Sequence, residues 1–517
     1  MIVLPRYGSS SVRRVSLFLL CPVIDGDPSP TPMIPTKLQT PEAEARNRPC
    51  SDGDARLSAA RRVVRSAFNG IISALLRLIF TLFTATTFAA DWSQFQGPHG
   101  DGTSPETGLL HVWPTNGPPI EWRAPIGQGW GAPSVAGDDV VIAWSEERSG
   151  MRESVACLDK HNGKERWRAT WNTGPYWVRN IGWAPGGVRA TPALTEKFVF
   201  AIGAVGHMHC LDRKNGAVVW ARDLWRSWLP SGEKGYVFSP LVVDGKLILW
   251  LSDGAREATK QDSPHESVCL ALDPATGREL WTFREPHRKT ASMGEGQTPA
   301  IAEFAGDKCV VVTANCQLKA LRVADGREVW KFDCIRPDAR ATTIPTPLVV
   351  GNLILDMADG DGNHVVEVDR TRADFPTRML WKKDQGLFTA IHQFRHHDGF
   401  VYGFLGHIEG ESEKTASDSV LSLTCMELAT GKIMWKDPGY KTGVSLIEAD
   451  GLLFVRSYQT LRLLAADPTA CRRLGEVKTH SVWKPTRNLT DFVSPVLSAG
   501  RLFIRTPEDL ICYRVKK

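Results

Sequence analysis

One short phrase recurs along this chain and limits what it can fold into. The phrase begins with a small residue, continues with Leu and Asp, passes a Gly and ends at a Trp, as in Ala271-Leu272-Asp273…Gly277…Trp281. Its tryptophans form a column separated by 45 to 61 residues: Trp122, Trp167, Trp220, Trp281, Trp330, Trp381 and Trp435. Self-similarity at such a period indicates a repeat architecture in which each unit packs against its neighbours.

A second marker keeps step with the first and indicates that the repeats are built of strands. A Ser, Thr or Ala followed by Pro precedes an apolar run at Pro133, Pro192, Pro240, Pro299, Pro347 and Pro495. Each run is short, is broken by a turn dipeptide such as Asp244-Gly245 and is followed by another run, which is the pattern of hairpins. We therefore predict an all-β chain.

The residue types of the phrase have structural explanations. The Asp side chain can accept hydrogen bonds from the backbone of the turn that follows, and the Gly supplies the positive φ that such a turn requires. One large flat ring per repeat suits packing between adjacent sheets. Cysteines stand where other repeats have Ala at Cys157, Cys210 and Cys425, which indicates small buried side chains rather than disulfide partners.

Repeats of about 50 residues with four short strands are typical of propeller blades. Counting the intervals predicts an eight-bladed β-propeller of four-stranded antiparallel blades over residues 91–517, with seven blades as the alternative. The last repeat lacks its final strand, and residues 120–123 stand before the first Pro marker without a repeat of their own. We expect this strand to complete the last blade, because closing the ring removes an exposed sheet edge.

The phrase resembles the tryptophan-docking repeat of pyrroloquinoline-quinone (PQQ)-like propellers, most closely at residues 271–281. The opening Trp92-Ser93-Gln94-Phe95-Gln96-Gly97-Pro98 also resembles the lead-in of secreted bacterial members. The resemblance implies relatives of two kinds, the propeller lipoprotein of outer-membrane assembly and the quinoprotein dehydrogenases. The dehydrogenases hold PQQ and Ca²⁺, so these are the cofactors that the enzymatic alternative implies.

The start of the chain has a different composition. Residues 57–90 run from basic residues through an apolar stretch to small residues, the order of a secretory signal peptide. Residues 1–56 are expected to be disordered or to precede the true start codon. A membrane anchor at residues 66–86 is the alternative, although Arg77 interrupts the apolar stretch. A periplasmic or secreted protein follows, with membrane attachment as the alternative.

The charge distribution argues against nucleic acid as a partner. Residues 1–90 carry 11 Lys and Arg against 6 Asp and Glu, whereas the remaining residues carry 51 of each. The globular part therefore has no excess of positive charge with which to neutralise phosphates.

The segments before the Pro markers should meet at one mouth of the central channel. They carry aromatic, cationic and amide side chains that would suit a planar polar ligand. For a bound quinone, Trp130 is the predicted stacking ring, Arg189 the partner of an acidic group and Gln297 a further contact. Glu295 and His392 are the candidate acid–base residues of an enzymatic reaction.

Calcium has one weak candidate site, the Gly-rich turn with Asp359, Asp361 and Asn363, which a solvated hairpin explains equally well. The chain lacks the adjacent Cys pair of alcohol-oxidising quinoproteins and the Cys-x-x-Cys-His haem motif. The sequence therefore favours a monomeric, non-catalytic binding or scaffold module without a cofactor, for a protein or carbohydrate partner. The alternative is a PQQ-dependent dehydrogenase of alcohols or polyvinyl alcohol-type polymers.

Overall fold

The computed structural model describes residues 90–146, 152–173, 187–224, 236, 238–252, 266–286, 297–336, 345–358, 361–383, 393–405, 421–440, 444–457, 459–479 and 493–517. Every described residue belongs to one compact unit, Thr87–Lys517. The predictions for residues 1–56 and for a signal peptide or anchor lie outside the described residues. Within the described ranges, no helix has the length and apolarity to span a membrane.

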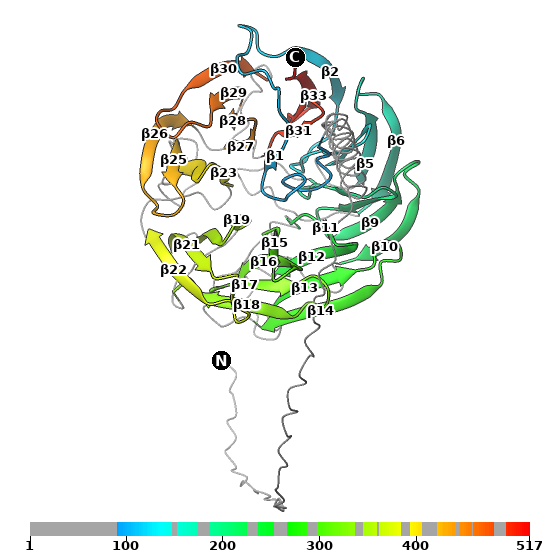
Figure 1. The fold of residues 1–517 in the computed structure, drawn as a ribbon. Helices are drawn as coiled ribbons and strands as arrows, with labels where there is room; N and C mark the ends of the chain where they lie inside the picture. Colours follow the sequence, from blue (N-terminus) through cyan, green and yellow to red (C-terminus); the bar gives the residue numbers. More distant parts are fainter. Residues whose placement is uncertain are drawn as a thin grey trace, which may run out of the picture. The chain divides into compact units, whose positions relative to one another are not determined.

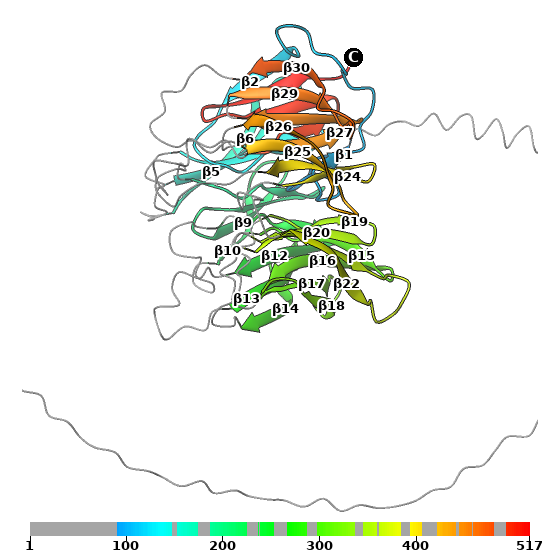
Figure 2. The same cartoon turned by 90° about the vertical axis from the view of Figure 1, so that its left-hand side faces the viewer.

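The described part of this compact unit is all-β, as predicted, and its strands form eight sheets of at least four strands. Seven of the sheets have only antiparallel neighbours, and the eighth gains a short parallel strand at its inner edge. The sheets follow one another around a ring in the order of the sequence (Figure 1) and are seen from the side in Figure 2. This is an eight-bladed β-propeller, and the seven-bladed alternative is wrong.

The first four blades each run from an innermost strand to an outer one. Blade 1 comprises β3 (Ser134–Ala136), β4 (Asp139–Ser145), β5 (Arg152–Asp159) and β6 (Glu165–Asn172). Blade 2 comprises β7 (Ala193–Leu194), β8 (Phe198–Ile202), β9 (His207–Asp212) and β10 (Val218–Asp223). Blade 3 comprises β11 (Leu241–Val243), β12 (Lys246–Ser252), β13 (Glu266–Leu272) and β14 (Glu279–Pro286). Blade 4 comprises β15 (Ala300–Phe304), β16 (Asp307–Ala314), β17 (Gln317–Arg322) and β18 (Glu328–Asp333).

The remaining blades follow the same order and include the two strands that come from the start of the unit. Blade 5 comprises β19 (Leu348–Val350), β20 (Leu353–Ala358), β21 (Gly362–Val368) and β22 (Thr377–Lys383). Blade 6 comprises β23 (Arg395–His397), β24 (Phe400–Leu405), β25 (Leu421–Glu427) and β26 (Ile433–Tyr440). Blade 7 comprises β1 (Thr103–Ser104), β27 (Val444–Ala449), β28 (Leu452–Ser457), β29 (Thr460–Ala465) and β30 (Arg473–Lys478). Blade 8 comprises β2 (Ile120–Pro125), β31 (Val496–Ser498), β32 (Arg501–Arg505) and β33 (Asp509–Arg514).

Blade 8 closes the ring in the predicted way. Its order is β2-β33-β32-β31, so one strand from the start of the unit pairs with three from its end. The antiparallel register joins Trp122 to Cys512 and Ala124 to Leu510. The predicted strand is therefore confirmed, and it extends two residues further than expected, to Pro125.

Six of the seven column tryptophans hydrogen-bond to the next blade, whereas Trp330 Nε1 has no hydrogen-bond partner among the described residues. The indole Nε1–H of Trp281 donates to the carbonyl oxygen of Val323 in blade 4 at 2.9 Å. Its ring lies against Gly326, where a Cβ atom would come within 2.5 Å of the Trp281 Cε3 atom. The same donation to a carbonyl of the following blade is made at 2.8–3.0 Å by Trp122, Trp167, Trp220, Trp381 and Trp435.

The Asp of the phrase acts as predicted. Asp273 Oδ1 accepts hydrogen bonds from the backbone N–H groups of Ala275 and Thr276 at 3.0 and 2.9 Å. Gly277 follows at a φ of 67°. Asp159, Asp212, Asp369 and Asp467 accept equivalent backbone bonds in their own turns. The phrase is therefore a turn built to receive the tryptophan of the preceding blade.

The apolar core lies mainly between neighbouring blades. One cluster, for example, combines Phe304 and Trp330 of blade 4 with Ile354 and Val366 of blade 5. Other clusters combine blades 2 and 3, and blades 6 and 7, in the same way. Cys157, Cys210 and Cys425 are buried free thiols, in agreement with their prediction as small buried side chains.

A lead-in segment, residues 91–104, crosses the inside of the ring before the first blade begins. Trp92 exchanges backbone hydrogen bonds with Val135 of blade 1, and the side chain of Gln94 accepts one from Val242 of blade 3. The segment ends in β1, which pairs in parallel with β27 of blade 7 and lies inside the ring in Figure 1. It therefore links blades that are far apart around the ring.

The tryptophan dock can be tested through a pair of glycines. Gly326→Ala should destabilise the protein by the cost of a left-handed residue, roughly 1–2 kcal/mol, and by the displaced Trp281 ring. Gly306→Ala is the matched control, because Gly306 also has a positive φ of 84° but has nothing within 4 Å of the position that a Cβ atom would take. Gly326→Ala should lower the melting temperature more than Gly306→Ala does. An equal decrease in both variants would contradict the contact between the Trp281 ring and Gly326.

Ring closure can be tested by two deletions. Removing residues 91–125 should expose the free edge of β33 and cause aggregation, measured by light scattering and thermal unfolding. Removing residues 91–104 keeps β2 and should leave a monomeric ring. A monomer with unchanged melting behaviour after the longer deletion would refute the role of β2.

The contact between the lead-in segment and blade 7 predicts a pH dependence. Burial raises the pKa of Glu448 to about 7, and the nearby carboxylates of Asp101, Asp398 and Asp450 contribute in the same direction. Glu448 Oε1 also lies 3.1 Å from His397 Nδ1. A raised carboxyl pKa means that the folded state binds more protons than the unfolded state, so stability falls as the pH rises from about 4.5 to about 7.

The variant Glu448→Gln removes this titration. At pH values above about 7, its melting temperature should be higher than that of the natural protein. The corresponding gain in the free energy of unfolding is roughly 1–3 kcal/mol. At pH values below about 4, where Glu448 is protonated in both states, the two proteins should melt alike. The exposed Glu165→Gln is the control, and the same pH profile for both variants would contradict the assignment.

Candidate functional site

Five of the predicted site residues belong to the described part of the chain: Trp130, Arg189, Gln297, Asp361 and Asn363. Glu295, His392 and Asp359 lie outside it, so their roles stay predictions. Trp130, Arg189 and Gln297 each lie just before the innermost strand of a blade. In blade 1, the turn at the other end of the innermost strand contacts the lead-in segment, because the Gly137 N–H donates to Asp91.

Trp130 and Arg189 meet at the start of blades 1 and 2. The backbone N–H of Trp130 donates to the carbonyl oxygen of Val188 at 2.7 Å, which joins the two segments. The guanidinium of Arg189 then lies over the Trp130 ring, 5.2 Å from its centroid, and is nearly buried. This is a cation–π contact, in which the guanidinium covers one face of the Trp130 ring.

Gln297 is placed differently. Its side chain is fully buried, donates to the carbonyl oxygen of Pro345 at 2.7 Å and accepts from the backbone N–H of Thr313 at 2.8 Å. Both ends of its amide are therefore engaged by blades 4 and 5. Because these bonds hold the seam between the two blades, Gln297 contributes to structure at this end of the ring.

A chain of hydroxyl groups fixes this end of the innermost strands. These groups belong to the residues that precede the marker prolines. The hydroxyl of Thr191 accepts a hydrogen bond from the backbone N–H of Ala132 at 3.1 Å. In turn, Ser239 accepts from Thr191, and Thr298 accepts from Ser239, each at 3.0 Å. The Ser or Thr of the Pro marker is thus an inter-blade link, a role that sequence reasoning missed although the marker itself was visible.

Asp361 is buried and paired with two cations. Arg336 Nε and Lys382 Nζ lie 2.7 and 2.6 Å from its carboxylate oxygens. Burial alone would raise the pKa of Asp361, but the hydrogen bonds from Lys382 and Arg336 lower it. The positive charges of Arg336 and Lys382 would repel a Ca²⁺ ion bound to the same carboxylate. The environment of Asp361 therefore does not fit Ca²⁺.

Asn363 lies close by on β21 and is fully buried. It offers amide groups but no charge. Among the described residues, a group of three His, Cys, Asp or Glu side chains close enough to share an ion occurs only elsewhere in blades 4 and 5. The cations beside Asp361 oppose a calcium ion there, and the predicted role of Asn363, whose amide atoms have no hydrogen-bond partner among the described residues, stays a prediction.

Three buried arginines were not singled out from the sequence. Arg505 donates to the carbonyl oxygens of Gly131 and Ala143 at 2.7 and 2.9 Å, and so joins blade 8 to blade 1. Arg395 donates to the carbonyl oxygen of Leu446, joining blade 6 to blade 7. Arg456 donates to the carbonyl oxygen of Val493. A cation at the end of an apolar strand run, as in Phe503-Ile504-Arg505, is a signal that could have found Arg505 and Arg456, whereas Arg395 begins its strand and has no such signal.

The fold and the family model agree. The model of the outer membrane protein assembly factor BamB matches residues 151–437. No curated protein matches this sequence. Among solved structures, quinohemoprotein alcohol dehydrogenase ADHIIG from Pseudomonas putida HK5 has a TM-score of 0.58 at 14% identity, covering 83% of this chain and 80% of that one. Quinohemoprotein alcohol dehydrogenase from Comamonas testosteroni has a TM-score of 0.60 at 12% identity, covering 82% and 80%.

BamB from Moraxella catarrhalis has a TM-score of 0.50 at 13% identity, covering 76% of this chain and 96% of that one. At these identities the structural likenesses show the fold, which assembly factor and dehydrogenases share. The family model spans more than half of the sequence. The chain therefore belongs to the PQQ-like propeller family of the outer membrane protein assembly factor BamB.

Proposed function

We propose that this protein is an exported, non-catalytic propeller that binds a protein partner in the periplasm or at the outer membrane. The observation that carries the proposal is the engagement of candidate cofactor residues in the fold. Both ends of the Gln297 amide bind backbone groups across a seam, and Asp361 pairs with two cations. Neither is available to a quinone or to Ca²⁺ without breaking these bonds.

A protein partner is supported by the family and by the outer surface of blade 2. The family is that of an outer membrane protein assembly factor, and this name describes a function that acts on other proteins. On this chain, β10 is the outer edge of its sheet and exposes Val218 and Val219, at 56% and 44% of their full accessible surface. A strand edge with exposed apolar side chains can receive an extended segment of a partner.

A second function, PQQ-dependent oxidation of alcohols, is favoured by one observation. The Arg189 guanidinium lies 5.2 Å from the centroid of the Trp130 ring. A planar, anionic quinone would need an aromatic ring and a cation, and it would have to stack on the ring face that the guanidinium does not cover or displace the guanidinium. Two structural relatives are quinohemoprotein alcohol dehydrogenases, which supports the same alternative.

A quinone titration of the full chain separates the two functions. PQQ is added with Ca²⁺ at micromolar concentrations while tryptophan fluorescence and PQQ-dependent dye reduction by simple alcohols are recorded. The scaffold function predicts no saturable quenching and no dye reduction. Saturable quenching that is lost in Trp130→Leu and Arg189→Gln, with dye reduction abolished by Glu295→Gln, would establish the dehydrogenase instead.

A second arm of this experiment addresses the partner. A photo-crosslinking side chain at Val218 should yield a covalent adduct with a protein of the cell envelope when the exported chain is irradiated. The same side chain at Lys331, on the outer strand of blade 4, is the matched control and should yield none. Equal labelling from both positions, or none from Val218, would contradict a partner at β10.

A further inference from the structure

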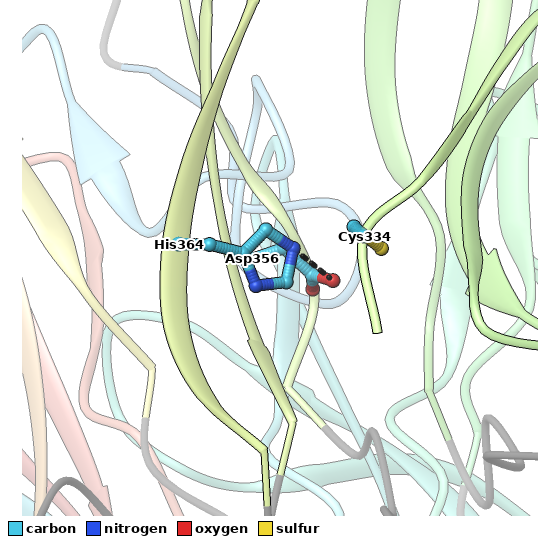
Figure 3. A group of neighbouring side chains, drawn as sticks. All are labelled: Cys334, Asp356 and His364. Atoms are coloured by element: carbon cyan, nitrogen blue, oxygen red, sulfur yellow. Dashed lines mark ion pairs between the residues drawn. The ribbon is translucent and has the colours of Figure 1, made fainter. Parts of the chain in front are cut away.

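Three side chains of different chemistry meet in the seam between blades 4 and 5. Cys334 directly follows β18, Asp356 lies on β20 and His364 lies on β21. One ligand atom from each lies within 4.8 Å of the others, and all three residues are at most 3% exposed. Figure 3 shows the imidazole and the carboxylate side by side, with the Cys334 sulfur on the side of blade 4.

The backbone holds these residues in place. Asp356 and His364 are direct cross-strand partners in the antiparallel pair of β20 and β21, so their side chains share one face of blade 5. Cys334 is fixed by its backbone N–H, which donates to the carbonyl oxygen of Cys316 at 3.1 Å. The cluster therefore rests on strands and a turn of the ring.

Three polar atoms of the cluster lack hydrogen-bond partners among the described residues, whereas Asp356 Oδ2 accepts from the Thr313 hydroxyl and the Cys334 thiol donates to the Cys316 carbonyl oxygen. Neither ring nitrogen of His364 has one, and neither has Asp356 Oδ1. His364 Nε2 lies 3.5 Å from Asp356 Oδ2, which is too long for a good hydrogen bond. Buried polar atoms in this state call for a ligand that can bind several of them at once.

We propose that Cys334, Asp356 and His364 bind one zinc-type divalent transition metal ion across the seam of blades 4 and 5. A thiolate, an imidazole and a carboxylate are ligands that Zn²⁺ accepts, whereas Ca²⁺ and Mg²⁺ require oxygen ligands alone. The three groups with neutral His364 carry two negative charges, so a divalent ion makes the buried centre neutral. This proposal does not depend on the proposed function.

Binding would release one proton. The Cys334 thiol has to lose its proton before its sulfur can bind the metal. As the sulfur–metal bond forms, this proton passes to solvent, and affinity rises with pH. Lys382 approaches from β22, and its Nζ lies 2.6 Å from Asp361 and 3.4 Å from the Cys334 carbonyl oxygen. Asp361 also pairs with Arg336, so this group of three side chains carries one net positive charge outside the cluster.

Blade 4 supplies a positioning residue as well as a ligand. The hydroxyl of Thr313 donates to Asp356 Oδ2 at 2.7 Å, and the Thr313 backbone N–H donates to Gln297. Gln297 thus orients the strand whose hydroxyl orients the carboxylate. Such outer hydrogen bonds typically change metal affinity by about 10–100-fold. The metal would tie blade 4 to blade 5 and act as a structural clamp.

The test uses the full chain without a histidine tag, freed of metal by dialysis against a chelator. After incubation with Zn²⁺ and gel filtration, metal analysis should find one equivalent bound, and the melting temperature should rise with Zn²⁺ concentration. Co²⁺ should give the near-ultraviolet thiolate-to-cobalt charge-transfer band and the visible bands of a four-coordinate ion. Absence of bound metal, or cobalt spectra without the thiolate band, would overturn the proposal.

Variants assign the ligands. Cys334→Ser should abolish the charge-transfer band, and Asp356→Asn and His364→Gln should lose stoichiometric Zn²⁺. Cys309→Ser is the matched control, since Cys309 is a buried thiol on β16 of the same blade outside the cluster. Thr313→Val should retain the band and weaken Zn²⁺ binding by about 10–100-fold. Retention of the band in Cys334→Ser, or its loss in folded Cys309→Ser, would refute the assignment.

Discussion

The contact of an indole ring with the glycine turn of the following blade is the interaction on which the rest of the ring depends. The Trp281 ring fills the space where Gly326 has no side chain, and its N–H satisfies the Val323 carbonyl. Each such contact joins two neighbouring blades. Stability in repeat folds is largely a sum over contacts between neighbouring units, so each blade is stabilised by its neighbours. In an open ring the first and last blades would each lack one of these contacts, which closure of the ring supplies. Trp122 on β2 provides the contact between the last blade and the first.

The polar groups of the interior follow the same logic of joining neighbours. Hydroxyls at the Pro markers satisfy backbone N–H groups of the preceding blade, as with Thr191 and Ala132. Arg505 and Arg395 carry charge into the seams but bind carbonyl oxygens there. A buried polar group without such partners is costly. The ring therefore uses many of its buried polar side chains for assembly, which leaves fewer of them for binding a ligand.

This use of polar groups bears on function, because fold alone does not distinguish an assembly factor from a dehydrogenase. Trp130 and Arg189 contact each other in a cation–π pair, whereas Gln297 and Asp361 bind other groups of the fold. The group of Cys334, Asp356 and His364 differs from both pairs. Several of its buried polar atoms have no hydrogen-bond partner among the described residues. It is the part of the described interior whose residue types are best explained by a bound ion.

The architecture could be predicted from the sequence. The Asp, Gly and Trp of the phrase act through turns and contacts that recur along the ring, so their spacing was enough to predict strands, blades and the closing strand at residues 120–123. The roles of single polar residues could be assigned only from the folded ring. Cys334, Asp356 and His364 come from three segments of two blades, and no local pattern records that they meet. Gln297 likewise has the same residue type whether it faces a ligand or a seam. Which one it faces depends on the neighbouring blade, because the fold of blade 5 against blade 4 places the Pro345 carbonyl within reach of its amide.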